Sequence, residues 1–196
     1  MCTDHQHGQR RCRCCDPEAR RAIRRTAQLR ERGWDGDVDE AYAAGTVQER
    51  AAMARISHTA SFDRSPTVRS VRARRGPLTP DEQAVLAADE SPRVRAALAA
   101  NPGTERDTLD TLSGDEDKRV REAVARHERT PSESLYAIAV SLDRRRDLGV
   151  ARALAQNSST PIVALEAIVA GGTTGQASVA QRALQERKRN PDYSIQ

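Results

Sequence analysis

The sequence contains few aromatic residues and almost no lysine. Aromatic side chains make up 3% of the 196 residues, and hydrophobic residues make up 37%. A core must therefore be built mainly from Ala, Val, Leu and Ile, which favours thin, closely packed helices over β-structure. Of the 32 basic residues only Lys118 and Lys188 are lysine.

The sequence also lacks the marks of a membrane protein or an enzyme. No apolar run reaches the length of a membrane span, and the N-terminus has no signal-peptide core. We therefore expect a cytoplasmic protein with no membrane partner. There is no metalloprotease histidine pair, no nucleophile elbow and no pair of carboxylates with a plausible pocket, and the glycines at 171–175 are not followed by the Lys of a phosphate-binding loop. These absences predict a non-enzyme.

One stretch, SPRVRAALAANPGTERDTLDTLSGDED at 91–117, has the pattern of a complete pair of helices. Ser91 is a candidate N-cap, and Pro92 suits the first helical position. The Asn101-Pro-Gly segment ends the first helix, and Thr104 begins a second one whose Leu109 and Leu112 share a face.

The same unit recurs along the chain. Val94-Arg95 is matched 26 residues upstream and downstream, in copies at 65–90 and 118–143, and a looser copy covers 148–172. Leu98, Val124 and Leu154 share one position and are predicted core residues. Repeated helix pairs with a period of 20–50 residues are typical of a solenoid, in which stacking completes the core.

Threonines mark the predicted start of each second helix. Thr79, Thr104, Thr130 and Thr160 superimpose at steps of 25, 26 and 30 residues. Glu82 and Glu133 each follow their threonine by three residues, which predicts capping boxes at Thr79 and Thr130.

The segment VRAALAANPGTERDTLDTLSGDED resembles the leucine-rich repeat variant family, and the likeness covers 65–172. The resemblance implies an all-α, right-handed solenoid of short helix pairs, similar to HEAT repeats, in which α-helices alternate with tighter, 3₁₀-like ones. His127 and Asn157 occupy the family's Asn position without a following proline, and Ala151 replaces the Arg that follows the repeat's Val.

These patterns divide the chain into four parts. We expect a Cys- and His-containing, arginine-rich arm and helix at 1–32, degenerate capping helices at 33–64, four repeats at 65–172, and a C-terminal capping helix and tail at 173–196.

The first fifteen residues hold all four cysteines and two of the four histidines, and are a candidate metal site. Thiolates and imidazoles are the ligands that zinc and iron–sulfur clusters need. The candidate ligands of zinc or a [4Fe–4S] cluster are Cys2, Cys12, Cys14, Cys15, His5 and His7. Some members of the resembled family carry an N-terminal cysteine cluster with a [4Fe–4S] centre. The spacing is not that of a zinc site, so a tail of reduced thiols, or a disulfide, remains an alternative.

The arm that follows is strongly basic. Residues 10–32 contain nine arginines and three acidic residues, which gives a net charge of +6, whereas residues 33–196 carry a net charge of −1. A basic arm predicts phosphate contacts with nucleic acid, and an arginine-rich solvated helix is the alternative. The candidate nucleic-acid-binding residues are Arg10, Arg11, Arg13, Arg20, Arg21, Arg24 and Arg25.

Arg69, Arg95 and Arg121 hold equivalent repeat positions and predict a row of arginines. The row would line a groove for phosphate or an acidic peptide, or form ion pairs between repeats with acids such as Asp89 and Asp115. The insertion DRRRD at 143–147 is predicted to be a solvated charge run, with a binding loop as the alternative.

The sequence as a whole predicts a non-enzymatic scaffold that binds a protein partner. Two alternatives belong to other classes: a nucleic-acid-binding protein that uses the basic arm, and a metal or iron–sulfur sensor that uses the cysteines.

Overall fold

The computed structural model describes residues 47–54, 58–143 and 146–189, which form helices, turns and loops and contain no strand. The chain divides after Gly76 into two compact units. Within the described ranges, no helix has the length and apolarity required to span a bilayer.

In the described part of the first unit, the buried carboxylate of Asp63 contacts two segments. The described elements of this unit are helix α3 (Val47–Met53), the 3₁₀ helix η1 (His58–Phe62) and helix α4 (Pro66–Arg75). Arg50 donates to Asp63 at 2.6 Å, and the backbone N–H of Ser65, the N-cap of α4, donates to the same carboxylate at 2.7 Å. One acidic side chain therefore joins α3 to the start of α4.

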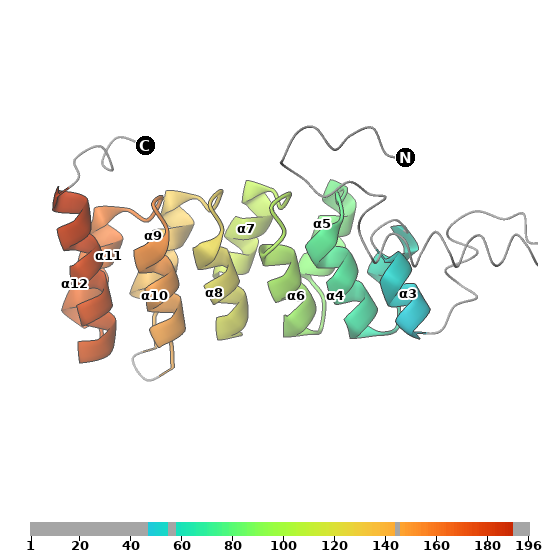
Figure 1. Cartoon of the computed structure of the whole chain (residues 1–196), viewed down its shortest axis with the longest axis horizontal. Helices are drawn as coiled ribbons and strands as arrows, with labels where there is room; N and C mark the ends of the chain where they lie inside the picture. The colour runs from blue at the N-terminus through green and yellow to red at the C-terminus, as the bar shows by residue number, and fades with distance from the viewer. Residues whose placement is uncertain (1–46, 55–57, 144–145, 190–196) are drawn as a thin grey trace, which may run out of the picture. The chain divides into compact units, whose positions relative to one another are not determined.

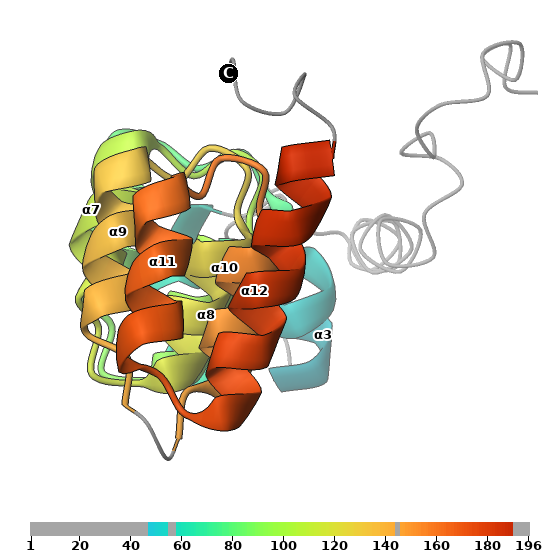
Figure 2. The same cartoon turned by 90° about the vertical axis from the view of Figure 1, so that its left-hand side faces the viewer.

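The second unit is an all-α repeat stack with two layers. Figure 1 shows the helices following one another in pairs, and Figure 2 shows the two layers from the end of the stack. One layer contains α6 (Pro92–Ala99), α8 (Lys118–Arg126), α10 (Leu148–Gln156) and α12 (Thr174–Arg189). The other contains α5 (Pro80–Ala87), α7 (Arg106–Ser113), α9 (Ser132–Val140) and α11 (Ile162–Gly171).

The core lies between these layers, at the predicted repeat positions. Leu98, Val124 and Leu154 each have 0% exposure, which confirms the repeat register of the first helices. In the opposite layer Leu109 and Leu135 are also fully buried. Because each layer contributes such a side chain in every repeat, the apolar core runs along the stack without interruption.

The four threonines expected at the starts of the second helices do not all hold the same position relative to the N-cap. Thr79 is the N-cap of α5 and forms the predicted capping box with Glu82, whose backbone N–H donates to the Thr79 hydroxyl at 3.2 Å. Thr104, Thr130 and Thr160 instead lie one residue before their N-caps, and all three are buried.

This offset changes what the threonine hydroxyl does. In Thr104 and Thr130 it faces the C-terminal end of the first helix, where carbonyl groups lack helical partners. Thr104 donates to the carbonyl of Leu98 and Thr130 to that of Val124, both at 2.6 Å. The predicted capping box at Thr130 is therefore wrong, because Pro131 is the N-cap of α9 and offers no side-chain bond.

Two further local expectations differ from the structure. The second helices of the pairs, α5, α7, α9 and α11, are α-helices and not the 3₁₀-like helices that the family resemblance implied. Ser91 is the N-cap of α6 as predicted, but its hydroxyl makes no capping bond. Its backbone N–H is held by the Asp89 carboxylate at 2.8 Å instead, so the cap of this helix comes from outside the helix.

The Asn position at the end of each first helix links successive repeats. Its side chain accepts a hydrogen bond from the backbone N–H two residues later, at 2.9 Å for Asn101, 3.1 Å for His127 and 2.9 Å for Asn157. His127 Nε2 also contacts the Asn101 carbonyl at 3.0 Å, and Asn157 donates to the His127 carbonyl at 3.0 Å. A histidine therefore fulfils both roles of the asparagine.

Helix α12 closes this series. Arg187 lies 30 residues after Asn157, is buried, and donates to the carbonyls of Asn157, at 2.7 Å, and Thr160. Ala180, 30 residues after the core residue Val150, is also buried. The helix thus takes the place of a first helix of one more repeat, and its arginine binds the Asn157 carbonyl, just as Asn157 binds the His127 carbonyl.

Candidate functional site

The candidate metal and arm residues lie outside the residues that the structure describes. These are Cys2, Cys12, Cys14, Cys15, His5, His7, Arg10, Arg11, Arg13, Arg20, Arg21, Arg24 and Arg25. Within the described ranges, no group of three or more His, Cys, Asp or Glu residues could hold a metal ion. The N-terminal metal site and the phosphate-binding arm stay predictions.

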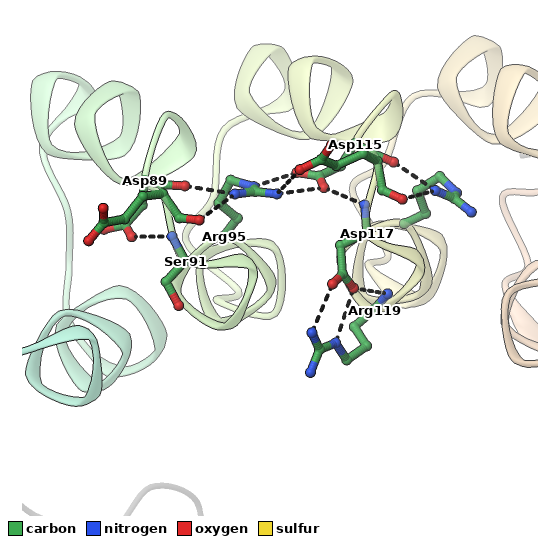
Figure 3. Close-up of polar contacts among 9 residues, drawn as sticks. Asp89, Ser91, Arg95, Asp115, Asp117 and Arg119 are labelled. Carbon is green, nitrogen blue, oxygen red and sulfur yellow. Dashed lines mark hydrogen bonds and ion pairs between the residues drawn. The ribbon is translucent and has the colours of Figure 1, made fainter.

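Arg95 joins three successive segments of the second unit (Figure 3). One guanidinium nitrogen donates to the backbone carbonyl of Asp89 at 2.8 Å. The other two nitrogens bind both carboxylate oxygens of Asp115, at 2.6 and 2.9 Å. Asp115 lies in the loop that follows α7. The two side chains are 11% and 7% exposed, and this bidentate bond raises the pKa of Arg95.

Arg121 repeats this arrangement one repeat later. It donates to the backbone carbonyls of Asp115 and Glu116 at 2.8 and 2.9 Å, and to the Asp147 carboxylate at 2.7 Å. We call Arg95, Asp115, Arg121 and Asp147 the arginine–aspartate ladder. Each arginine binds carbonyl groups of the preceding loop and a carboxylate of the following one, so the ladder links neighbouring repeats.

The insertion at 143–147 supplies the last carboxylate of the ladder. Asp147 has a side chain with 0% exposure and also accepts from the backbone N–H of Asp143 at 2.9 Å. The expectation of a solvated charge run is wrong for this residue. Its burial is tolerated because the guanidinium of Arg121 offsets the cost of removing the carboxylate from water.

Arg69, the third arginine of the predicted row, lies in the first unit. It is 9% exposed and donates to the backbone carbonyls of Asp63 and Arg64, at 2.7 and 3.3 Å. Arg69, Arg95 and Arg121 thus bind loop carbonyls in the same way. The expected acids that precede them contribute these carbonyls, whereas the carboxylate that binds Arg95 comes 20 residues after it.

Asp117 caps α8 beside the ladder (Figure 3). Its carboxylate accepts from the Arg119 guanidinium at 2.8 Å and from the Arg119 backbone N–H at 2.8 Å. The bond from the Arg119 side chain is the main cause that lowers the pKa of Asp117 to about 2, and the Arg119 backbone N–H and charge add to it. Its own backbone N–H donates to Asp115 at 2.8 Å.

The two layers of the second unit carry opposite charge. Helices α6, α8, α10 and α12 contain eleven Arg and Lys residues and two Glu, a net of +9. Helices α5, α7, α9 and α11 contain one Arg and six acidic residues, a net of −5. The near-neutral total for 33–196 therefore hides a strong separation of charge between the layers.

Exposed cations of the first layer form a basic face. Three of its eleven cations are structural, since Arg95 and Arg121 belong to the ladder and Arg187 closes the Asn series. Six of the other eight, all exposed, define the basic face: Arg93, Lys118, Arg119, Arg126, Arg152 and Arg182.

The opposite layer has an acidic outer face with apolar side chains at one end. Five exposed carboxylates lie there: Asp81, Asp107, Asp110, Glu133 and Glu166. On the neighbouring helices α9 and α11, Tyr136 is 44% exposed, Val140 58%, Ile162 41% and Val163 56%. We call these four side chains the apolar patch.

Both faces went unrecognised in the sequence, although a signal was present. Basic and acidic residues alternate between consecutive helices, and alternate helices of a pairwise repeat share a layer.

Comparison with known proteins supports the repeat itself. Residues 92–117 match a family described as leucine rich repeat variant. Neither the curated proteins nor the solved structures gave a match. The matched segment contains α6, α7, Arg95, Asn101 and Asp115, so it includes the residues that join one repeat to the next. The segment at 92–117 is therefore similar to a repeat of the leucine rich repeat variant family, and it lies within a stack of paired helices.

Proposed function

We propose that this chain is a non-enzymatic scaffold that binds a protein partner through the outer face of α9 and α11. The observation that carries this proposal is the apolar patch. Tyr136, Val140, Ile162 and Val163 are 41–58% exposed on adjacent helices, while Arg106, Asp107 and Asp110 hold three of the equivalent positions on α7. Interface cores are enriched in aromatic and apolar side chains that lose water on binding.

The charges around the patch define the partner further. Glu133 and Glu166 lie on the same two helices, and Asp107 and Asp110 lie on α7 beside them. Because complementary charge steers association and excludes wrong partners, we expect the partner to present basic side chains around an apolar anchor. An amphipathic helix with a basic rim has this chemistry.

The ladder supports this role indirectly. Its arginines are committed to loop carbonyls and aspartates, so they hold the repeats in place and do not line a binding groove. A scaffold held in this way presents its outer helices without reorganisation, which lowers the entropic cost of binding.

The test is affinity capture with the tagged full chain, followed by cross-linking. A Tyr136→Ser/Val163→Ser variant removes one side chain of the patch from each of the two helices. The matched control is Leu148→Ser/Val85→Ser, which changes side chains of 44% and 41% exposure on other helices. We expect a stoichiometric partner that the wild type and the control retain and the patch variant loses. Equal capture by both variants would place the binding surface elsewhere.

A further inference from the structure

The basic face has the composition of a surface that contacts phosphates. Arg93, Lys118 and Arg152 have no ion-pair partner among the described residues. Arg119 is paired with Asp117, Arg126 with Glu122 and Arg182 with Glu186, and all three arginine side chains are more than half exposed. Such exposed pairs contribute little to stability, so their arginines remain available to a stronger anion.

The face lacks the features of a protein-binding surface. Helices α6, α8, α10 and α12 contain no aromatic residue, and Leu148 is their one large exposed hydrophobic side chain. A protein interface needs a desolvated apolar centre, which this face does not offer. The absence of aromatic side chains on these helices also disfavours single-stranded nucleic acid, whose bases stack on aromatic rings.

The repeat places the cations in rows. Arg93 and Arg119 hold one position in successive repeats, and Arg152 and Arg182 hold another. Packed helices lie about 8–10 Å apart. A duplex carries one phosphate charge per about 1.7 Å of its axis. Cations on successive helices therefore lie close enough together to contact several phosphates of the same duplex.

We propose that the basic face of α6, α8, α10 and α12 binds the sugar–phosphate backbone of double-stranded nucleic acid without sequence preference. The ligand contacts are ionic, from guanidinium and ammonium groups to phosphate oxygens, and no side chain on the face reads bases by stacking. This surface is separate from the apolar patch, which lies on the other layer. The chain would then hold a protein on one face and a duplex on the other.

The experiment measures binding of a fluorescent 20-base-pair DNA duplex to the full chain by anisotropy, over a series of salt concentrations. The face variant is Arg93→Gln/Lys118→Gln/Arg152→Gln. Each lost phosphate contact lowers the slope of log K against log salt by about 0.9, so we expect a slope smaller by about 3. The variant should keep the wild-type melting temperature, because these side chains are exposed.

A control variant makes the same change in net charge on the opposite layer. Ala84→Glu/Thr111→Glu/Ala137→Glu alters three exposed positions of α5, α7 and α9. The proposal requires this control to keep the wild-type slope. Equal loss of slope in both variants, or an unchanged slope in the face variant, would overturn it and leave the N-terminal arm as the phosphate-binding segment.

Two competitors decide the class of ligand. Unlabelled duplex should displace the probe, whereas polyglutamate and a single strand of the same length should compete at least tenfold more weakly. Polyglutamate as effective as duplex would show a surface for acidic protein, and a tighter single strand would exclude duplex recognition. Because no protein partner of the apolar patch takes part in this assay, failure of this proposal leaves the protein-binding proposal untouched.

Discussion

Arg121 donates to the carboxylate of Asp147 at 2.7 Å, across an inter-repeat step that is four residues longer than the one before it. The position equivalent to Asp115 in this repeat is Ser141, which has no carboxylate. The insertion brings Asp147 to the guanidinium that would otherwise be buried without a counter-charge. The ladder therefore continues through the longest connection of the stack.

The ladder predicts a large difference between two adjacent acidic residues. Asp115→Asn removes the charge that binds Arg95, whose side chain is 11% exposed, and should lower the free energy of unfolding by about 1–3 kcal/mol. Glu116→Gln is the control, because its side chain is 90% exposed and 3.8 Å from Arg95, and should change stability by less than about 0.5 kcal/mol. Urea denaturation measures both; equal costs would remove the ladder as a stabilising feature.

The insertion predicts coupling between Arg121 and Asp147. Arg121→Met and Asp147→Asn each leave a buried charge without its partner, whereas the double variant leaves none. We expect the double variant to be about 1–3 kcal/mol more stable than the sum of the single costs implies. A double-mutant cycle from urea unfolding gives this coupling energy, and additive costs would show that the two side chains do not depend on one another.

The Asn series predicts that His127→Asn is tolerated. Asn157 shows that an asparagine at this position binds the preceding repeat and accepts the backbone N–H two residues later. His127→Asn should therefore stay within about 0.5 kcal/mol of the wild type, and His127→Ala should lose about 1–3 kcal/mol because buried backbone groups lose their partners. Glu128→Ala, at the exposed neighbour, is the control. Similar losses for Asn and Ala would mean that the ring packs and does not bridge.

The core predicts that truncating a buried apolar side chain costs much more stability than truncating an exposed one. Leu98→Ala removes a side chain with 0% exposure and should cost about 2–4 kcal/mol from lost burial and a cavity. Val140→Ala, at 58% exposure, should cost less than about 0.5 kcal/mol. Melting midpoints measure both, and an unchanged midpoint for Leu98→Ala would contradict the repeat register.

Asp117 predicts one part of the acid sensitivity of the stack. Its folded pKa of about 2 lies below the ordinary value of 3.8, so its contribution is fully present above about pH 4. That contribution is lost as the pH falls from 4 toward 2, because the proton binds the unfolded chain more readily. Asp117→Asn keeps a good N-cap residue and loses an exposed ion pair, so it should lower stability at pH 7 by less than about 1 kcal/mol. The variant should also flatten the pH dependence between 4 and 2 in denaturation curves; an unaltered pH profile would contradict the shift.

The repeat period, the helical class and the buried positions were determined by the sequence alone. Val94, Leu98 and their equivalents recur at a fixed interval, and a side chain that recurs on one helix face must meet the neighbouring repeat. Periodicity carries this information because the burial of apolar surface does not depend on the identity of a distant partner.

The tertiary structure decided the polar contacts. Thr79 accepts a hydrogen bond as an N-cap, whereas Thr104, one residue before its N-cap, donates to the Leu98 carbonyl. The sequence does not reveal this difference of one residue, because the spacing between the threonines itself varies from repeat to repeat. Likewise, Arg95 and Arg93 differ by two positions, yet the first is bound to Asp115 and the second lies on the basic face. Hydrogen bonds and ion pairs are directional and short-ranged, so they depend on which loops and helices the packing brings within about 3 Å.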